Sequence, residues 1–423
     1  MTSNQTNPET GDETQEDDIL AVYGSQEPDG DDLTQLTEHH RKFAPWHHPV
    51  KQIVRNEQWA KLTARLLNDR PAGSPQILRY FTLPGEDLLD IKVLAEACTP
   101  LGVRIEYFGF NSGIIADSDE EASKKTEEDE RSISRAPWVT AESALRQAGR
   151  VTPDAIIHSD RLEDIALEHS HAATQLRQRP PFDVINIDAC DHLAYAPKGR
   201  DRNTFDALQA LLRHQMSARN PWLLFLTTRV DPALLGQPRI DFQHAITQNL
   251  NVPESGFGAA LAECLDAEET RLATALNTAW NTHNIHFLKL YSVGLGKFLL
   301  QFFCGQPNLP ANVELASTYA YRVHKDEPDM LALAFRIIPD PPRVYPPSTG
   351  GAAVVPTLEP ARAIRVAQRA ARLWDIDKAL ENDSDLRTEA ITGTQLLLES
   401  SNYDIDAWRD WLAKHERRPI TVA

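Results

Sequence analysis

Short runs rich in apolar residues alternate along the chain with amphipathic stretches. The runs at residues 77–83, 103–110, 155–158, 184–188 and 221–227 are typical of strands that are buried on both faces of a parallel sheet. Apolar residues recur with helical spacing between them, at residues 52–67, 86–97, 138–149, 161–176 and 205–216. Strands that alternate with helices predict right-handed β-α-β units, and so an α/β fold with a doubly wound, mostly parallel sheet.

The second half of the chain changes this pattern. A long helix is expected at residues 261–280, followed by strands at 315–324 and 330–338, which a charged turn joins into a terminal β-hairpin. Proline and glycine are frequent from residue 339 to 351, so residues 341–357 are interpreted as a linker. Helical patterns at 359–374, up to 398 and at 403–415 predict a helical C-terminal extension, residues 358–423.

The N-terminal segment is acidic and poor in apolar residues. Eleven Asp and Glu and no Lys or Arg precede Arg41, so this segment carries most of the net charge of −18. Such a composition predicts a disordered tail, residues 1–43, which either solubilises the protein or docks through the short apolar island at 18–23. The folded α/β domain is then expected at residues 44–340, interrupted by a polar insertion at 117–135. The negative charge does not support nucleic acid as a partner.

Cysteine usage and hydropathy suggest a compartment. The four cysteines are far apart in the sequence and form no C-x-x-C motif, which favours reduced thiols in a cytoplasmic protein. The chain begins with no basic and apolar leader, and no stretch approaches the roughly 18 apolar residues of a membrane span. We therefore expect a cytoplasmic protein that does not interact with membranes.

The segment 181–191, Pro-Phe-Asp-Val-Ile-Asn-Ile-Asp-Ala-Cys-Asp, carries the most information. It resembles the fourth-strand motif of class I S-adenosylmethionine-dependent methyltransferases, in which F-D-x-I-x-I-D-A-D is common. The resemblance implies a sheet of methyltransferase type, with a hairpin added after five α/β units. Ligands of open α/β sheets bind at the carboxyl ends of the strands, so Asp188 and Asp191 are the candidate catalytic residues. The alternative is that both are strand-end residues satisfied by backbone amides.

Three further positions correspond to the cofactor-binding elements that the resemblance implies. Gly85 is the single glycine of the turn after the first strand, and Asn111 follows the second strand in place of the ribose-binding acid. Asp160 lies in the turn after the third strand, where the family reads the adenine, although an Asp before a helix is also a common N-cap. The acids Glu86 and Asp87 occupy the same first turn and would equally stabilise a helix N-terminus.

Other candidate chemistry is weaker. Residues 227–229 after the fifth strand contain no carboxylate, and Cys190 occupies the second acidic position of the motif, so no metal site is predicted. Residues 293–298 are interpreted as a turn before a buried helix rather than as a phosphate loop. Arginines at 362, 365, 369 and 372 form one basic stripe, which is either a solvated face or a contact for an acidic partner, a phosphate backbone or the acidic tail.

Two functions are compatible with these features. The incomplete cofactor motifs and the extensions favour a catalytically degenerate methyltransferase-like protein, the interaction subunit of a cytosolic, bacterial multiprotein assembly with protein partners. The alternative is an active methyltransferase that uses S-adenosylmethionine to modify a small molecule or a protein. The residues by themselves leave open whether the protein is an enzyme.

Overall fold

The computed structural model describes residues 39–112, 138–189, 191–197, 199–306, 310–340 and 359–415. The expected polar insertion at 117–135, the linker at 341–357, Cys190 and nearly all of the acidic tail lie outside these ranges. The described chain divides into two compact units. One runs from residue 43 to residue 401, and the other combines residues 39–42 with 402–415.

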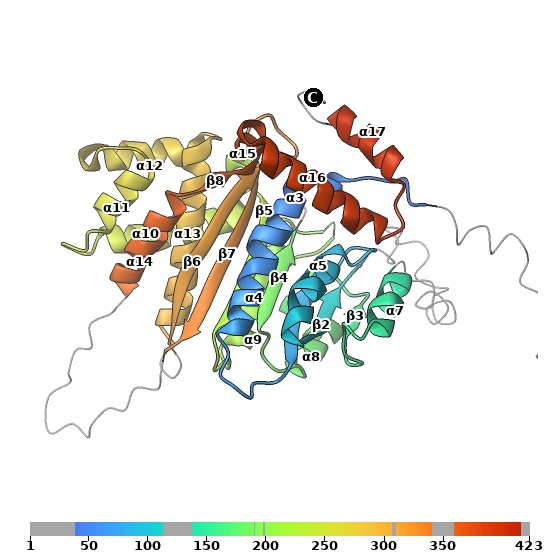
Figure 1. Ribbon diagram of the computed structural model, residues 1–423. Coiled ribbons are helices and arrows are strands. Elements are labelled where there is room, and N and C mark those ends of the chain that lie inside the picture. The colour runs from blue at the N-terminus through green and yellow to red at the C-terminus, as the bar shows by residue number, and fades with distance from the viewer. Residues whose placement is uncertain are drawn as a thin grey trace, which may run out of the picture. The chain divides into compact units, whose positions relative to one another are not determined.

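The larger unit is built on a mixed eight-stranded sheet (Figure 1). Its strands are β1 (Ile77–Thr82), β2 (Arg104–Phe110), β3 (Ile156–His158), β4 (Val184–Asp188), β5 (Trp222–Arg229), β6 (Ala311–Tyr321), β7 (Met330–Pro339) and β8 (Trp374–Asp375). The strand order is β3-β2-β1-β4-β5-β7-β6-β8, with β1 to β5 mutually parallel and β7 antiparallel to both β5 and β6. The predicted α/β class, the five parallel strands and the hairpin are confirmed.

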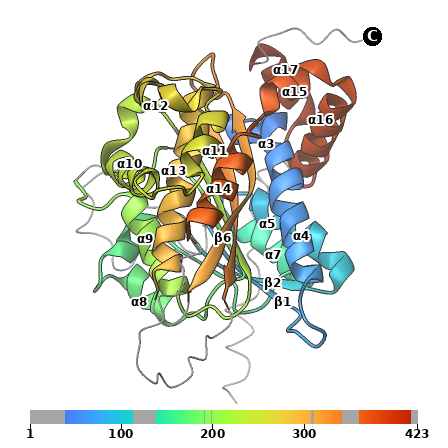
Figure 2. The same cartoon turned by 90° about the vertical axis from the view of Figure 1, so that its left-hand side faces the viewer.

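Helices cover both faces of this sheet (Figure 2). One face packs against α3 (Pro49–Ile53), the π-helical η2 (Val54–Ala60), α4 (Lys61–Asn68), α5 (Leu89–Cys98), α7 (Val139–Gln147), α15 (Ile376–Asn382) and α16 (Ser384–Glu399). The other packs against η5 (Leu162–Ala166), α8 (His171–Arg177), α9 (Thr204–Gln215), α10 (Gly236–Leu250), α11 (Phe257–Cys264), α12 (Leu272–Asn281), α13 (Ile285–Cys304) and α14 (Glu359–Ala370). Short 3-10 turns complete the unit: η1 (Pro45–His47), η3 (Thr99–Leu101), η6 (Pro232–Leu234) and η7 (Glu269–Arg271).

Two helices that the periodicity predicted as continuous are broken. The stretch 161–176 forms η5 and then α8, because Ser170 accepts a hydrogen bond from the Ala173 amide and starts a new helix. The stretch 261–280 is divided between α11 and α12 by a turn in which Asp266 adopts a left-handed φ of 53°. The apolar spacing continues across this break because both helices pack into the same core cluster.

The C-terminal region contributes to both units. The helix α14 packs on α11, α13 and β6, and β8 adds a parallel two-residue strand to the edge of β6. The sequence pattern gave no indication of β8. The smaller unit contains α17 (Ile405–His415), a β-bridge between His40 and Tyr403 and an ion pair between Arg41 and Asp404 at 2.9 Å.

The turn expected at residues 293–298 is wrong, because these residues lie in the interior of α13. The helix is long and apolar enough to cross a membrane, so the expectation that no stretch approaches such a span is wrong. In the structure 72% of its apolar window is buried inside the unit. Its two glycines permit close packing: a Cβ at Gly294 would lie 2.7 Å from the Cβ of Phe242, and one at Gly296 would lie 2.5 Å from Val366 Cγ1.

This packing makes a prediction for Gly294→Ala. Alanine favours a helix over glycine by about 1 kcal/mol, yet overpacking against α10 should cost more and lower the free energy of unfolding by about 1–3 kcal/mol. The control is Gly258→Ala in α11, where the nearest atom to an added Cβ is a carboxylate oxygen of the exposed Glu269 side chain at 3.4 Å. Urea denaturation should show the control to be neutral or stabilised. Equal stability of both variants would contradict the close packing.

Candidate functional site

A cavity of about 680 Å³ opens at the carboxyl ends of β1 to β4. The strand order reverses between β1 and β4, and at such a point the loops after the two strands diverge and leave a crevice. The helical segment from α3 to η2 and the β6–β7 hairpin supply further walls. Its volume falls in the range of small-molecule and cofactor sites.

All five candidate site residues line this one cavity. Gly85 follows β1, Asn111 follows β2, Asp160 follows β3, Asp188 ends β4, and Asp191 lies just beyond it. They are distant in sequence, and they meet because the carboxyl ends of parallel strands share one edge of the sheet. Glu106, earlier in β2, is not among the residues that line the cavity.

The loop after β1 is held by its neighbours. Asn111 donates its side-chain amide to the carbonyl of Pro84 at 2.9 Å, and its backbone amide bonds to the carbonyl of His158. Gly109 is required beside this loop, because a Cβ there would lie 2.9 Å from Pro84 Cδ. A Cβ at Gly85, in contrast, would meet no atom of the described residues within 4 Å. The loop therefore has a fixed shape that leaves space at Gly85.

The helix expected at residues 86–97 begins later. α5 starts at Leu89, after Leu88 turns the chain with a left-handed φ of 51°. Glu86 and Asp87 precede the helix and line the cavity, so the prediction that they form its first turn is wrong. Asp90 does lie in the first turn of α5.

Lys51 is the main residue of the site that sequence reasoning missed. It projects from α3, its side chain is 5% exposed, and its Nζ lies 2.5 Å from Oδ1 of Asp188. The ammonium also lies 4.9 Å from the ring centroid of Trp59 and 6.0 Å from that of Tyr321. The ion pair neutralises the charge of Asp188 at the end of β4.

A signal for Lys51 was present in the sequence. The polar residues Lys51, Arg55 and Gln58 recur at i, i+4 and i+7, and all three are buried. Charged residues are rarely buried without a partner, so a polar stripe beside an apolar one indicates partners elsewhere in the fold. Gln58 donates to Ser317 Oγ and to the carbonyl of Ala332.

A buried carboxylate, that of Asp90, lies near this ion pair. Its Oδ2 accepts hydrogen bonds from Tyr80 at 2.9 Å and from Thr82 at 2.5 Å, and Asn186 donates to the Tyr80 hydroxyl. Burial raises the pKa of Asp90, and the nearby charge of Asp188 adds to this effect. Burial also raises the pKa of Tyr80 well above its usual range, so this hydroxyl remains a donor.

Asp191 has a different environment from Asp188. Its side chain is 43% exposed, and its Oδ1 accepts a hydrogen bond from the His192 amide at 2.8 Å. The carbonyl of Asp191 accepts from the Thr228 hydroxyl and the Arg229 amide. These contacts fix the loop after β4 to the end of β5.

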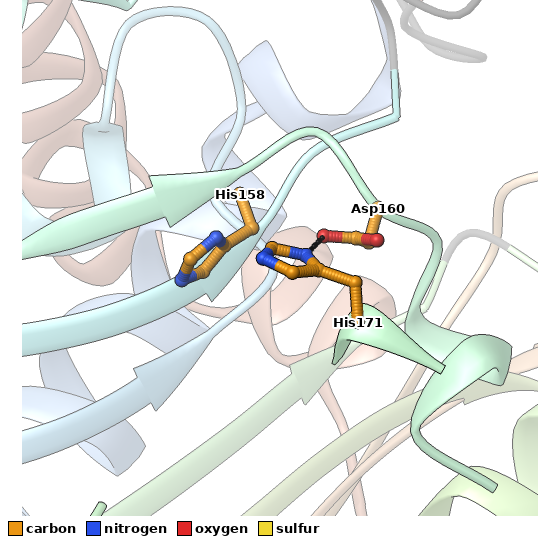
Figure 3. A group of neighbouring side chains, drawn as sticks. All are labelled: His158, Asp160 and His171. Carbon is orange, nitrogen blue, oxygen red and sulfur yellow. Dashed lines mark hydrogen bonds and ion pairs between the residues drawn. The ribbon is translucent and has the colours of Figure 1, made fainter. Parts of the chain in front are cut away.

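One group of side chains, of which only Asp160 lines the cavity, has the donor types of a metal site (Figure 3). The ligand atoms of His158, Asp160 and His171 lie within 4.8 Å of one another, and His171 Nδ1 bonds to Asp160 Oδ2 at 2.9 Å. Two imidazoles and a carboxylate are a set that Zn²⁺ binds. Burial and the neighbouring His171 lower the pKa of His158, which favours its neutral form. A shared ion would have to replace the bond between His171 and Asp160.

Negative charge predominates around the cavity. Three basic side chains line it, Lys51, Arg55 and Arg161, together with His324. The carboxylates outnumber them and are Glu86, Asp87, Asp90, Asp160, Glu163, Asp188 and Asp191. Such a lining favours a ligand that carries positive charge.

The model of the PP_RS20740-like family matches residues 40–413. The chain therefore belongs to the PP_RS20740-like family, and the match includes the whole sheet and the candidate cavity. No curated protein matches the chain.

The ion pair predicts the effect of Asp188→Asn. The substitution removes the carboxylate that neutralises a buried ammonium and should lower the free energy of unfolding by about 2–4 kcal/mol. The matched control, Asp191→Asn, alters a half-exposed side chain and should cost less than about 1 kcal/mol. Adding Lys51→Met to Asp188→Asn should restore most of the loss. Urea denaturation of the three variants tests this, and equal losses in the two single variants would contradict it.

The raised pKa of Asp90 predicts a pH effect. Above the ordinary carboxyl pKa of 3.8 the folded protein binds more protons at this residue than the unfolded chain, so its contribution to stability falls as pH rises. Asp90→Asn removes this dependence and keeps an acceptor for Tyr80 and Thr82. The variant should gain stability relative to the natural protein between pH 4 and pH 7. If the stability difference between the variant and the natural protein is constant over this interval, the pKa of Asp90 is not raised.

Proposed function

We propose that the protein binds S-adenosylmethionine in the cavity at the carboxyl ends of β1 to β4 and acts as a methyltransferase on a small molecule or a protein. The observation that carries the proposal is the convergence of Gly85, Asn111, Asp160 and Asp188 on one cavity. These are the positions that the resemblance to class I methyltransferases implies for the cofactor and the acceptor. The antiparallel hairpin beside β5 also supports a sheet of that type.

The residues present are suited to this cofactor in charge and in space. S-adenosylmethionine has a cationic sulfonium, an ammonium and a carboxylate. The acidic lining would favour the first two groups, while Lys51 and Arg55 offer charge to the carboxylate. The space at Gly85 would allow the ligand to approach the backbone of the loop. Phe110 and Leu162 supply apolar surface near Asp160.

One departure from the family pattern affects the ribose. Asn111 stands where a carboxylate is usual, and its amide group already donates to Pro84. A neutral acceptor binds hydroxyl groups less strongly than a charged one. We therefore expect cofactor affinity in the micromolar range rather than the nanomolar range.

The roles of the acidic residues follow from their environments. S-adenosylmethionine supplies an electrophilic methyl group when it is bound. Asp188 is positioned by Lys51 and would accept the proton of an acceptor hydroxyl or amine. Asp90, with its raised pKa, is suited to a hydrogen-bonding role behind it. Asp191 would orient the acceptor at the mouth of the cavity.

A specific observation favours a second function. Lys51 neutralises Asp188, and Asn111 is bonded to Pro84, so two key polar groups are satisfied by the protein's own residues. A site of this kind is stable without a ligand, as expected for a catalytically degenerate interaction subunit of a protein assembly. A measurement of S-adenosylmethionine binding distinguishes the methyltransferase from the interaction subunit.

We expect calorimetry to show that the natural protein binds S-adenosylmethionine and S-adenosylhomocysteine near 10 μM, which corresponds to about −7 kcal/mol. A hundredfold excess over the dissociation constant should then stabilise the fold by about 2.7 kcal/mol. Gly85→Ala should weaken binding at least tenfold, because the added methyl would take up space that the cofactor needs. The stability of the protein should be unchanged, because the methyl meets no described atom within 4 Å. Gly258→Ala is the control with unchanged binding. Absence of heat at millimolar ligand would exclude the enzyme and leave the interaction subunit.

A further inference from the structure

A second cavity, of about 530 Å³, lies at the amino-terminal part of β6, between α4 and α14. Its lining shares no residue with the candidate site at the carboxyl ends of β1 to β4. The outer edge of β6 is paired by β8 only at Tyr319 and Ala320. Residues 312–316 border the cavity, and they have no neighbouring strand on their outer side among the described residues. Figures 1 and 2 show α14 beside β6.

Six arginines from three elements converge on this cavity. They are Arg65 of α4, Arg336 of β7, and Arg362, Arg365, Arg369 and Arg372 on or just after α14. The last four, of which Arg372 lies just beyond the end of α14, are the basic stripe of the sequence. In the structure this stripe forms one wall of the cavity, and Arg65 and Arg336 line the same cavity from α4 and β7.

Most of these guanidinium groups lack a carboxylate in the described part of the chain. Arg336 pairs with Asp69 at 2.9 Å and Arg362 with Asp340 at 3.1 Å. No side-chain hydrogen bond or ion pair joins the other four arginines to a described residue. The Nε of Arg336 is buried and has no hydrogen-bond partner among the described residues. The cavity thus offers donors that its own residues leave unused.

This concentration of charge has an energetic cost. Arginines three or four residues apart on one helix repel each other by a few tenths of a kcal/mol per pair. Three carboxylates, Glu314, Asp69 and Asp340, lie among the six arginines, which leaves a net charge of +3 in a protein of net charge −18. A bound anion would offset this repulsion.

The donors and the walls indicate the kind of anion. The planar guanidinium fork matches phosphate oxygens in a bidentate way, and several forks suit a chain of phosphates better than a single carboxylate. The cavity is large enough for a cofactor-sized molecule. Leu62, Leu66, Leu223 and Val366 supply an apolar wall that a flat ring would cover.

We propose that this arginine cavity binds a nucleoside diphosphate or triphosphate. The phosphates contact Arg365, Arg369 and Arg372, with Arg65 opposite them, and the base lies on the apolar wall. The site is separate from the proposed methyltransferase site, and its ligand has the opposite charge.

The test is calorimetric titration of the full-length protein with ATP, GTP and pyrophosphate, without added metal and at about 100 mM salt. We expect micromolar binding of the nucleotides and weaker binding of pyrophosphate, which lacks the ring. The variant Arg365→Gln/Arg369→Gln removes two exposed guanidiniums without an ion-pair partner in the described chain and should weaken binding about a hundredfold. Its thermal stability should be unchanged or slightly higher, because the substitutions relieve the repulsion among these arginines.

Two controls accompany this variant. Arg213→Gln/Arg219→Gln makes the same charge change at exposed positions that line neither cavity and should bind ATP as the natural protein does. Gly85→Ala should also keep ATP binding, which excludes capture of the adenosine group by the cavity at the carboxyl ends of β1 to β4. Loss of binding in either control would overturn the assignment.

Three other results would also overturn the proposal. The first is no binding of ATP at about 5 mM, and the second is equal binding by the natural protein and the Arg365→Gln/Arg369→Gln variant. The third is equal or tighter binding of a polyglutamate peptide or an RNA oligonucleotide with the same dependence on these arginines. That outcome would indicate a surface that recognises charge on a macromolecule rather than a cavity for a nucleotide.

Discussion

The structure depends on the burial of both faces of the central strands. In β4 and β5 the side chains of Val184, Ile185, Ile187, Leu224 and Phe225 are fully buried, some against one face and some against the other. Both faces must therefore be covered by helices, and the backbone polar groups of these strands are used in the ladder. Polar side chains are accommodated mainly where the strands end. This constraint places Asp188 at the end of β4, facing the cavity.

The few polar groups inside that apolar environment are organised by their partners. Asp188 is neutralised by Lys51, and Asp90 is held by hydroxyl donors from β1. In a low-dielectric interior such pairs are strong once formed and costly to leave incomplete. The same arrangement serves two purposes, since it fixes the walls of the cavity and sets the charge that a ligand would meet.

The two cavities differ in electrostatic character. Carboxylates predominate around the carboxyl ends of the parallel strands, while arginines predominate at the amino-terminal part of β6. Local potentials of opposite sign direct ligands of opposite charge to separate places on one protein. A net charge of −18 describes neither cavity, because much of it belongs to the N-terminal segment.

Local sequence patterns were sufficient to predict the class of the fold and the residues that meet at the candidate site. Strand runs such as 184–188 are local patterns, and the parallel arrangement brings their ends to one edge, so Gly85, Asn111, Asp160 and Asp188 were predicted in advance. The ion pair joins Lys51 to Asp188, which are 137 residues apart in the sequence. The arginine cavity likewise has walls from two helices that are distant in the sequence, with Arg65 on one and Arg369 on the other. The breaks within 161–176 and 261–280, and the helical setting of Gly294, were also decided by packing. Periodicity reports which face of a segment is buried, whereas the partner that buries it is fixed only when distant segments meet in three dimensions.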